Sequence, residues 1–305
     1  MQIDQFAQNL KTHGATADCK GVPLVKEDAT KVAAFETTSK NPGNRRMATV
    51  ASVCTVDLHV RTAEEITEAL FREEPDPAKP NPQRPEPANK ITTAHKPEMV
   101  GEGDASELRI SGIHVAMAWM IGQITQRRRP RQVLIVLIDG QASLWATLKL
   151  HLSFGPRTVP ILDIVHALAH LWEAAGLFEK DEGLRRSFAR ERLLRILRGE
   201  IRGVIKGLRR LGTTRELKGE AAKDLARICG YWEKHSDRMQ YDEYLRCGYP
   251  SASGVIEGAC RHLVKDRMEP SGMRWTLEGA HLMLNVRAAF QMQLLGILLG
   301  KSNVR

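Results

Sequence analysis

The sequence predicts an α/β protein whose sheet is followed by a long helical part. Two runs rich in Val, Thr and Ala, residues 15–25 and 47–56, have the composition of strands. Residues 133–138 are six consecutive aliphatic residues, as a strand covered on both faces requires. Residues 181–305 instead carry apolar residues at helical spacing. A sheet with covered faces and a separate helical region therefore follows from the pattern.

The first part of the chain predicts two strands and a short helix. The turn-forming residues 41–44 separate the two strand-like runs. Thr62 can cap a helix over 63–71, with Glu64 and Glu65 in its first turn. Residues 73–90 hold six of the fourteen prolines, which remove backbone donors, so we expect an extended surface linker there.

The middle of the chain alternates helices and strands. The pattern predicts helix at 110–126, strand at 131–139, helix at 141–152, strand at 158–162 and a helix from Asp163. Beyond residue 181 the chain is expected to be helical throughout. One apolar stripe in that region is formed by Leu194, Leu197, Ile201, Val204, Leu208 and Leu211.

Composition and charge narrow the class of protein. Of the 305 residues, 42% are hydrophobic and 27% charged, which suits a packed core. No apolar run is long enough to span a bilayer and the N-terminus has no signal-peptide pattern, so we expect no membrane residence. Five widely spaced cysteines without a C-x-x-C pair suit a reducing compartment, and a cytoplasmic protein is expected.

The net charge of +9 is concentrated in one segment. Residues 185–218 contain twelve Lys or Arg against three Glu, which equals the whole excess of the chain. A polyanionic partner is expected to meet this segment first.

Three acids occupy positions that suit chemistry. Asp139 follows the buried strand, at an end where ligands bind in α/β sheets, although it could also cap the next helix. Asp18 lies inside a strand-like run, where a carboxylate needs a salt bridge, a metal or a solvent-facing edge. Glu257 lies early in a helix that also carries Arg261, with which it could form an i,i+4 pair.

Sites for two-metal phosphoryl transfer use carboxylate ligands, and acids on two strands and a helix can provide them. Two Mg²⁺ ions held by carboxylates activate the nucleophile and stabilise the leaving oxygen of a phosphodiester. Mn²⁺ is expected to substitute for Mg²⁺. Other arrangements have weaker support, because no phosphate loop and no nucleophile elbow occur.

Four segments resemble DDE transposases of bacterial insertion sequences, closest to the ISKra family and more distantly to mutator-type enzymes. They are Ala17–Pro23 (ADCKGVP), Leu137–Trp145 (LIDGQASLW), Ile161–His166 (ILDIVH) and Ser253–Met268 (SGVIEGACRHLVKDRM). The similarity spans roughly residues 14–287, and the block from Glu257 to Trp275 is its most specific part.

The resemblance implies a ribonuclease-H-like catalytic core with an all-α insertion before the helix that bears the glutamate. It maps Asp18, Asp139 and Glu257 onto the catalytic, metal-binding acids. It also implies a truncated copy, because relatives carry a DNA-binding region before the first acid. The expected division is first core strands at 1–72, linker at 73–90, the rest of the α/β core at 91–180, basic helical insertion at 181–247 and C-terminal core helices at 248–305.

Further residues are assigned around this centre. Asp163 and His166 could support the active site, or be a helix cap and a packed histidine; with His170 they could also line up a transition metal. Trp275 could stack on a base or belong to the core. The cations expected to contact DNA are Arg195, Arg198, Arg202, Arg209, Arg261, Lys265, Arg267 and Arg274.

The function expected from the sequence is metal-dependent cleavage and transfer of DNA strands by a transposase, acting as a homo-oligomer on double-stranded DNA. Two rivals remain open. One is a nuclease built on the same core, which would produce no joined strand-transfer product. The other is an inactive remnant that only binds DNA, which metal-dependent nicking would exclude.

Overall fold

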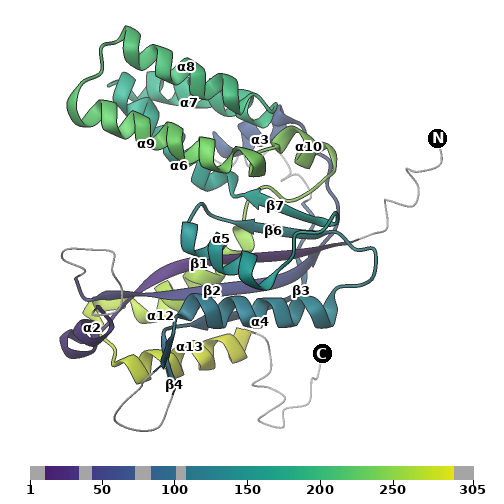
Figure 1. Cartoon of the computed structure of the whole chain (residues 1–305), viewed down its shortest axis with the longest axis vertical. Coiled ribbons are helices and arrows are strands. Elements are labelled where there is room, and N and C mark those ends of the chain that lie inside the picture. The colour runs from purple at the N-terminus through teal and green to yellow at the C-terminus, as the bar shows by residue number, and fades with distance from the viewer. Residues whose placement is uncertain (1–10, 34–42, 73–83, 101–107, 292–305) are drawn as a thin grey trace.

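A computed structural model describes residues 11–33, 43–72, 84–100 and 108–291, and its main feature is a five-stranded mixed sheet (Figure 1). The strand order is β3-β2-β1-β6-β7; β1, β2 and β3 pair antiparallel, and β6 and β7 run parallel to β1. Strands β4 (Glu98–Val100) and β5 (Leu108–Ile110) form a separate pair. The sheet strands are β1 (Thr12–Pro23), β2 (Arg45–Val56), β3 (Ala88–His95), β6 (Leu134–Ile138) and β7 (Thr158–Leu162). The chain is therefore an α/β protein.

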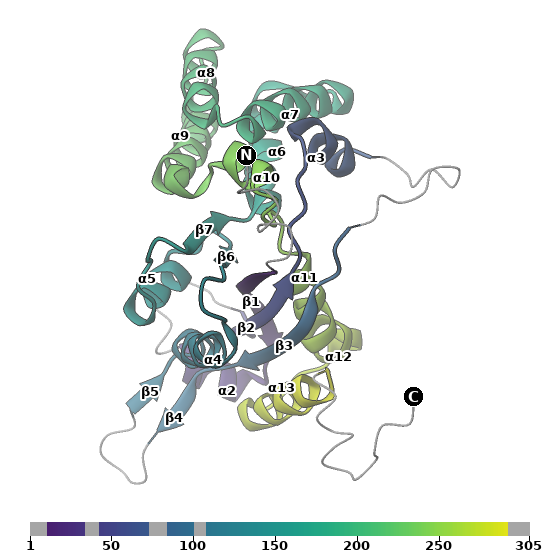
Figure 2. The ribbon, with the colours of Figure 1, turned by 90° about the vertical axis from the view of Figure 1, so that its right-hand side faces the viewer.

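Helices cover both faces of this sheet, as Figure 2 shows. On one face, Ala17 and Val136 pack with α4 (Gly112–Arg127) and α5 (Ala142–His151). On the other, Val50 belongs to a second core formed with the C-terminal helices. Those helices are α11 (Gly254–Cys260), α12 (Asp266–Met268) and α13 (Leu277–Gln291), and α2 (Lys26–Ala33) lies near them.

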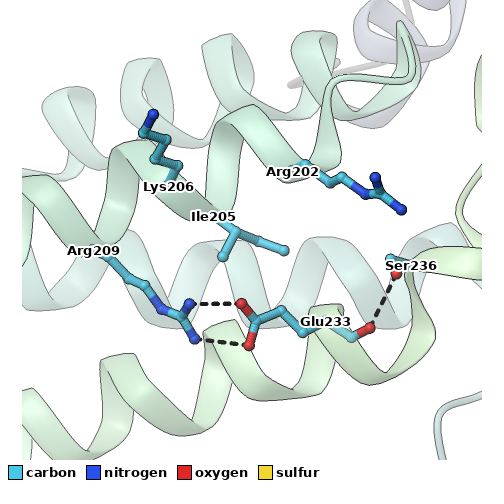
Figure 3. Close-up of a pocket in the computed structure, with 6 residues that line it drawn as sticks. All are labelled: Arg202, Ile205, Lys206, Arg209, Glu233 and Ser236. Atoms are coloured by element: carbon cyan, nitrogen blue, oxygen red, sulfur yellow. Dashed lines mark hydrogen bonds and ion pairs between the residues drawn. The ribbon is translucent and has the colours of Figure 1, made fainter.

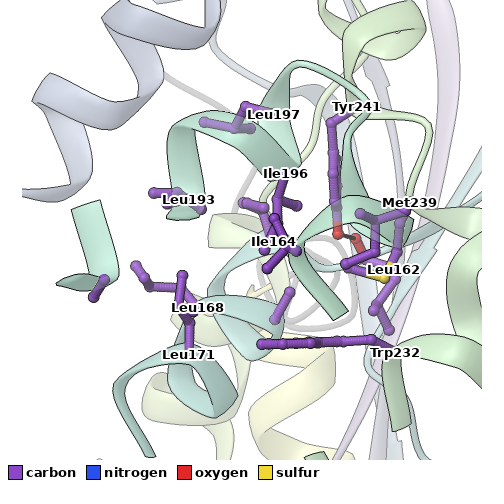
Figure 4. Packing of buried hydrophobic residues seen from close by; sticks show 14 of the residues in the cluster. Leu162, Ile164, Leu168, Leu171, Leu193, Ile196, Leu197, Trp232, Met239 and Tyr241 are labelled. Carbon is purple, nitrogen blue, oxygen red and sulfur yellow. Dashed lines mark hydrogen bonds between the residues drawn. The ribbon is translucent and has the colours of Figure 1, made fainter. Parts of the chain in front are cut away.

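A helical layer stands between β7 and α11 in the sequence and projects beyond the sheet (Figure 1). We call residues 164–246 the helical insertion. It packs on α3 (Ala63–Leu70) and shares a core with β6 and β7 (Figure 4). Its elements are α6 (Ile164–Phe178), α7 (Glu182–Leu197), α8 (Ile201–Thr214), α9 (Gly219–His235), the 3₁₀ turn η1 (Ser236–Arg238) and α10 (Tyr241–Arg246).

Most of the strands and helices predicted from the sequence are confirmed. The strand at 158–162 has the predicted bounds, and the others differ by a few residues at their ends. The α3 helix begins with a capping box, in which Thr62 and Glu65 exchange two backbone hydrogen bonds. Within the described residues no helix is both long and apolar enough to cross a lipid bilayer.

Three predictions need correction. Residues 88–90, assigned to the linker, begin β3, while residues 73–83 of that linker lie outside the described residues. The apolar stripe from Leu194 to Leu211 belongs to two helices, because Gly199 adopts a φ of 81° between α7 and α8. The helix predicted to carry both Glu257 and Arg261 is not one continuous α-helix, because α11 ends at Cys260 and the chain takes π-helical geometry at Arg261–Lys265 (η2). Residues 292–305, expected to be helical, are outside the described part.

Candidate active site at the strand ends

Asp18 and Asp139 lie in matching register on neighbouring parallel strands, just beyond the stretch in which these strands pair. The β1–β6 ladder ends where Ala15 pairs with Val136, and each acid is three residues further along the chain: Asp18 within β1, where it pairs with Val50 of β2, and Asp139 directly after β6. Side chains alternate across a strand, and Ala15, Ala17 and Val136 face the α4–α5 core. Asp18 and Asp139 are therefore expected to face the opposite side, toward the helical insertion and α11.

Asp163 continues this row on the next strand. Ile138 pairs with Leu162, so Asp139 and Asp163 both come directly after the last paired position. The Asp163 side chain is fully buried; its Oδ1 accepts the Val165 N–H at 2.9 Å, which caps α6. Its Oδ2 accepts both the N–H, at 3.2 Å, and the hydroxyl of Ser253. The cap predicted for Asp163 is confirmed, and the residue also reaches the start of α11.

The helix that carries Glu257 is held at both of its ends. Ser253, bound by Asp163, precedes α11, and its carbonyl accepts the Glu257 N–H at 3.1 Å. At the far end, the Cys260 thiol donates to Asp18 Oδ2 at 3.5 Å. One helix therefore links the acid of β1 to the acid that follows β7, with Glu257 exposed between the two contacts.

The acids act on one another electrostatically. Burial raises the pKa of Asp139 above its usual value; the charges of Asp18 and Asp163 add to the rise, and a hydrogen bond from the Gln141 N–H opposes it. Partial burial likewise raises the pKa of Glu257, with contributions from Asp163 and Asp18. We call Asp18, Asp139, Asp163 and Glu257 the acid group.

His166 is a titratable base beside the acid group. Its Nδ1 lies 3.7 Å from Asp163 Oδ2, and the pKa of the imidazole is raised first by its interaction with Asp163 and further by Asp139 and Asp18. When protonated, this half-exposed imidazole would reduce the repulsion among the acids. A supporting role for His166 stays a prediction.

The acid group has the donor chemistry of a site for a hard divalent cation, since carboxylate oxygens are the preferred ligands of Mg²⁺. In the described part of the chain, however, no three His, Cys, Asp or Glu side chains are gathered closely enough to hold one ion. Like charges without a counter-ion repel one another. The case for a metal site thus rests on three observations: the residues are carboxylates, Asp18 and Asp139 share a register, and the other acids contribute to the raised pKa of Asp139 and of Glu257.

The local alternatives are resolved differently for each acid. Asp139 Oδ1 accepts the Gln141 N–H at 2.9 Å, but Gln141 is itself the N-cap of α5 and no described side chain caps this helix, so Asp139 lies just before the cap and is not the predicted cap residue. Arg261 lies 3.6 Å from Asp266, and no Glu257–Arg261 pair occurs among the described residues. His170 contacts Glu173 and the ring of Tyr231, so it does not join Asp163 in a transition-metal site.

The basic segment contains both paired and unpaired cations. Three of the four arginines expected to bind DNA form ion pairs: Arg195 with Glu200 at 2.8 Å, Arg198 with Glu64 at 2.7 Å and Arg209 with Glu233 at 2.6 Å. Within the described residues, no ion pair involves the exposed side chains of Arg202, Lys206 or Arg210. These three cations on α8 are the ones most available to a polyanion.

Two shallow cavities flank α8. The cavity between α8 and α9 has a volume of about 390 Å³; Arg202 and Lys206 line it beside the Arg209–Glu233 pair (Figure 3). The other, of about 310 Å³, lies between α7 and α8 and is lined by Arg192, Arg195 and Arg210 among others. Cationic side chains therefore line the grooves on both sides of α8.

The cations near the C-terminal helices are exposed, whereas Trp275 is packed. Arg261, Lys265, Arg267 and Arg274 all face solvent. The Trp275 indole N–H donates to the Met268 carbonyl at 3.1 Å, and its ring packs on the core of α11–α13. Trp275 is thus partly buried against this core, which agrees with the second of its two expected roles; base stacking stays a prediction.

Several residues of this region could not be identified from the sequence. Ser253 and Cys260, which fix α11, are separated from their partners by 90 and 242 residues. Tyr231 packs against Gly140, the residue after Asp139. The one available signal was that glycine, since a glycine beside a functional acid allows close approach by another group.

Comparison of the chain with protein-family models, curated proteins and solved structures found no match.

Proposed function

We propose that this chain is a DDE-type transposase that cleaves and transfers DNA strands with divalent metal ions, as a homo-oligomer on double-stranded DNA. The observation that carries the proposal is the shared register of Asp18 and Asp139, each three residues beyond the last pair of the β1–β6 ladder, with the Glu257 helix bound to Asp18 through Cys260. Acids that are far apart in the sequence thus interact electrostatically in the folded chain.

The fold supports a ribonuclease-H-like core for this function. Its helical insertion lies between the last strand of the sheet and the helix that bears the glutamate, as the resemblance to DDE transposases implies. The sheet is mixed and open, and both of its faces are covered. Ligands of such sheets bind outside the carboxyl ends of the parallel strands. Asp139 and Asp163 lie at such ends, directly after β6 and β7, and Asp18 lies on the neighbouring strand β1 in register with Asp139.

The roles of the residues follow from their contacts. Asp18, Asp139 and Glu257 would hold Mg²⁺ or Mn²⁺, while buried Asp163 keeps the start of α11 in place through Ser253. When bound, these ions supply an activated oxygen nucleophile and stabilise the leaving oxygen of the phosphodiester. His166 offsets part of the negative charge of the acids before DNA and metal arrive.

The basic face of α8 would bind the DNA backbone. Arg202, Lys206 and Arg210 have no ion pair within the described residues and line the grooves on both sides of the helix. Contacts of this kind reach phosphates, which position DNA without reading its sequence. The exposed cations after Glu257 would bind the strand that enters the acid group.

The first prediction tests the metal centre with Glu257→Gln. We expect metal-dependent cleavage of duplex DNA to fall by at least about 100-fold, because the substitution removes a carboxylate charge that would hold the divalent ion at the reacting phosphate. DNA affinity without metal should stay the same or rise. The rates are measured with Mg²⁺ and with Mn²⁺ on a labelled duplex, and the single Asp18→Asn and Asp139→Asn variants should lose similar activity.

The matched control is Glu278→Gln, an exposed glutamate in the first turn of α13. It removes the same charge from a neighbouring helix and should cleave at the wild-type rate. Cleavage by Glu257→Gln at the wild-type rate would contradict the assignment.

The rival that only binds DNA has one observation in its favour, namely that no three ligating side chains converge in the described part of the chain. Metal-dependent nicking by the wild-type protein, abolished in Glu257→Gln, excludes it. Binding without nicking under every metal condition supports it.

A further inference from the structure

The turn after β6, Asp139–Gln141, is enclosed by side chains from α5 and from the helical insertion. The Trp145 indole N–H donates to the Asp139 carbonyl at 2.6 Å, and Trp145 is almost fully buried. The Asp139 side chain accepts the Gln141 N–H at 2.9 Å. Both the backbone and the carboxylate of Asp139 are thus fixed from the α5 side.

Tyr231 of α9 contacts the other side of the turn. A Cβ atom placed on Gly140 would lie 2.2–2.4 Å from the Tyr231 ring and hydroxyl, so the ring rests directly on the glycine backbone. Burial raises the pKa of the Tyr231 hydroxyl, and the charge of Asp139 adds to the rise, while a hydrogen bond with the Gly140 backbone opposes it. Only glycine permits this approach.

Arg238 of η1 joins Tyr231 to Trp145. Its guanidinium lies 4.1 Å from the centre of the Trp145 ring, within cation–π range, and Nη1 donates to His235 Nδ1 at 3.0 Å. Burial, aided by the Arg238 charge, lowers the pKa of His235 to about 4, so His235 is neutral and can accept this bond. The His235 ring in turn lies 4.9 Å from that of Tyr231.

We propose that Tyr231 and Arg238 are positioning residues for Asp139. Tyr231, His235, Arg238 and Trp145 form a clasp around residues 139–141, through which the helical insertion fixes the orientation of the Asp139 carboxylate. Metal binding by Asp139 rests on the proposed function. The contacts that form the clasp are independent of that function.

The arrangement has a consequence for the helical insertion. Between Tyr231 and His235 on α9 lies Glu233, which pairs with Arg209 beside the cavity in Figure 3. The helix that contacts the Asp139 turn therefore also lines a groove where a phosphate could compete for Arg209. The insertion joins the basic surface to the acid group through a single helix.

Hydrogen exchange of the metal-free protein tests the clasp without requiring activity. In Tyr231→Ala and Arg238→Ala we expect faster exchange of a peptide covering residues 138–146 and unchanged exchange in β1 and β2. The control is Tyr244→Phe. Tyr244 also belongs to the helical insertion, but its hydroxyl donates to the Pro160 carbonyl of β7 and not to the turn. Unchanged exchange at 138–146 in both variants would overturn the proposal.

The metal requirement separates positioning from simple stabilisation. In folded Tyr231→Ala we expect cleavage at a fixed Mg²⁺ concentration to fall about 10–100-fold, as for residues that orient metal ligands, with partial recovery at higher Mg²⁺. A role limited to stability would leave the Mg²⁺ midpoint unchanged. If Tyr231→Ala does not fold, hydrogen exchange and the Mg²⁺ dependence of cleavage are both measured on Tyr231→Phe. If the wild type does not cleave, the proposed function fails, while exchange still decides on the clasp.

Discussion

At the scale of single residues, the acid group has a cost in stability. Asp139 is partly buried among other acids, and its pKa is raised by burial and by Asp18 and Asp163. The folded state therefore binds a proton on Asp139 more tightly than the unfolded state does. The contribution of Asp139 to the free energy of unfolding is then most favourable below its unfolded pKa of about 3.8. It becomes less favourable as the pH rises through the folded pKa.

Asp139→Asn tests this account. Without divalent cations, we expect the variant to unfold at a higher temperature than the wild type at about pH 7, and the difference to shrink toward about pH 4, because asparagine carries no charge to bury. Its side-chain oxygen can still accept the Gln141 N–H. Thermal unfolding is followed in EDTA across this range, and added Mg²⁺ should stabilise the wild type more than the variant.

A suitable control is Asp57→Asn, which removes an exposed carboxylate 3.5 Å from Lys11. It should lower the unfolding temperature slightly or not at all. Parallel curves of midpoint against pH for wild type and Asp139→Asn would show that Asp139 is not destabilised by its surroundings.

The same residues show what the sequence could and could not predict. Asp139 could be placed at a strand end because six aliphatic residues precede it. Asp18 and Asp139 could be matched only after the β1–β6 pairing was known, since a parallel register is not encoded locally. The Asp163–Ser253 contact spans 90 residues, and no local pattern indicates where the chain returns after a helical insertion.

At the scale of elements, the break between α7 and α8 shows how a continuous apolar pattern can mislead. Leu194 and Leu211 share one stripe in the sequence, yet Gly199 ends α7 in the left-handed region. A Cβ on Gly199 would lie 2.8 Å from the Asp242 carboxylate. The start of β3 is not predictable from the sequence for a different reason. Prolines precede it, and Asn89, its second residue, has a φ of 51°, which is not a strand conformation.

A pair of glycine substitutions measures this break. Gly199→Ala should destabilise the protein by about 1–2 kcal/mol, the cost of a left-handed conformation for a residue with a Cβ. Gly207→Ala, within α8 and with nothing within 4 Å of the added methyl group, should stabilise by about 0.5–1 kcal/mol. Urea unfolding at equilibrium gives both values. Equal effects of the two substitutions would mean that Gly199 does not end the helix in solution.

At the scale of the whole molecule, the basic surface and the acid group lie on different layers. The cations of α8 are on the helical insertion, which projects from the sheet (Figure 1), while the acids are on or directly after strands of the sheet and on α11. A duplex bound along α8 would thus be held by phosphate contacts at a distance from the reacting bond. Such contacts add affinity that depends on salt and not on sequence.

The final prediction compares two triple variants that remove the same charge from this surface. Replacing Arg202, Lys206 and Arg210 with Ala should lower the slope of log affinity against log salt by up to about 0.9 for each lost phosphate contact. Replacing Arg195, Arg198 and Arg209 should lower it less, because each of these already pairs with a glutamate. Binding of an unrelated duplex sequence should weaken in parallel in the first variant. Equal slopes for the two variants would show that DNA breaks the ion pairs on binding, and the paired arginines would then contribute as much as the unpaired cations.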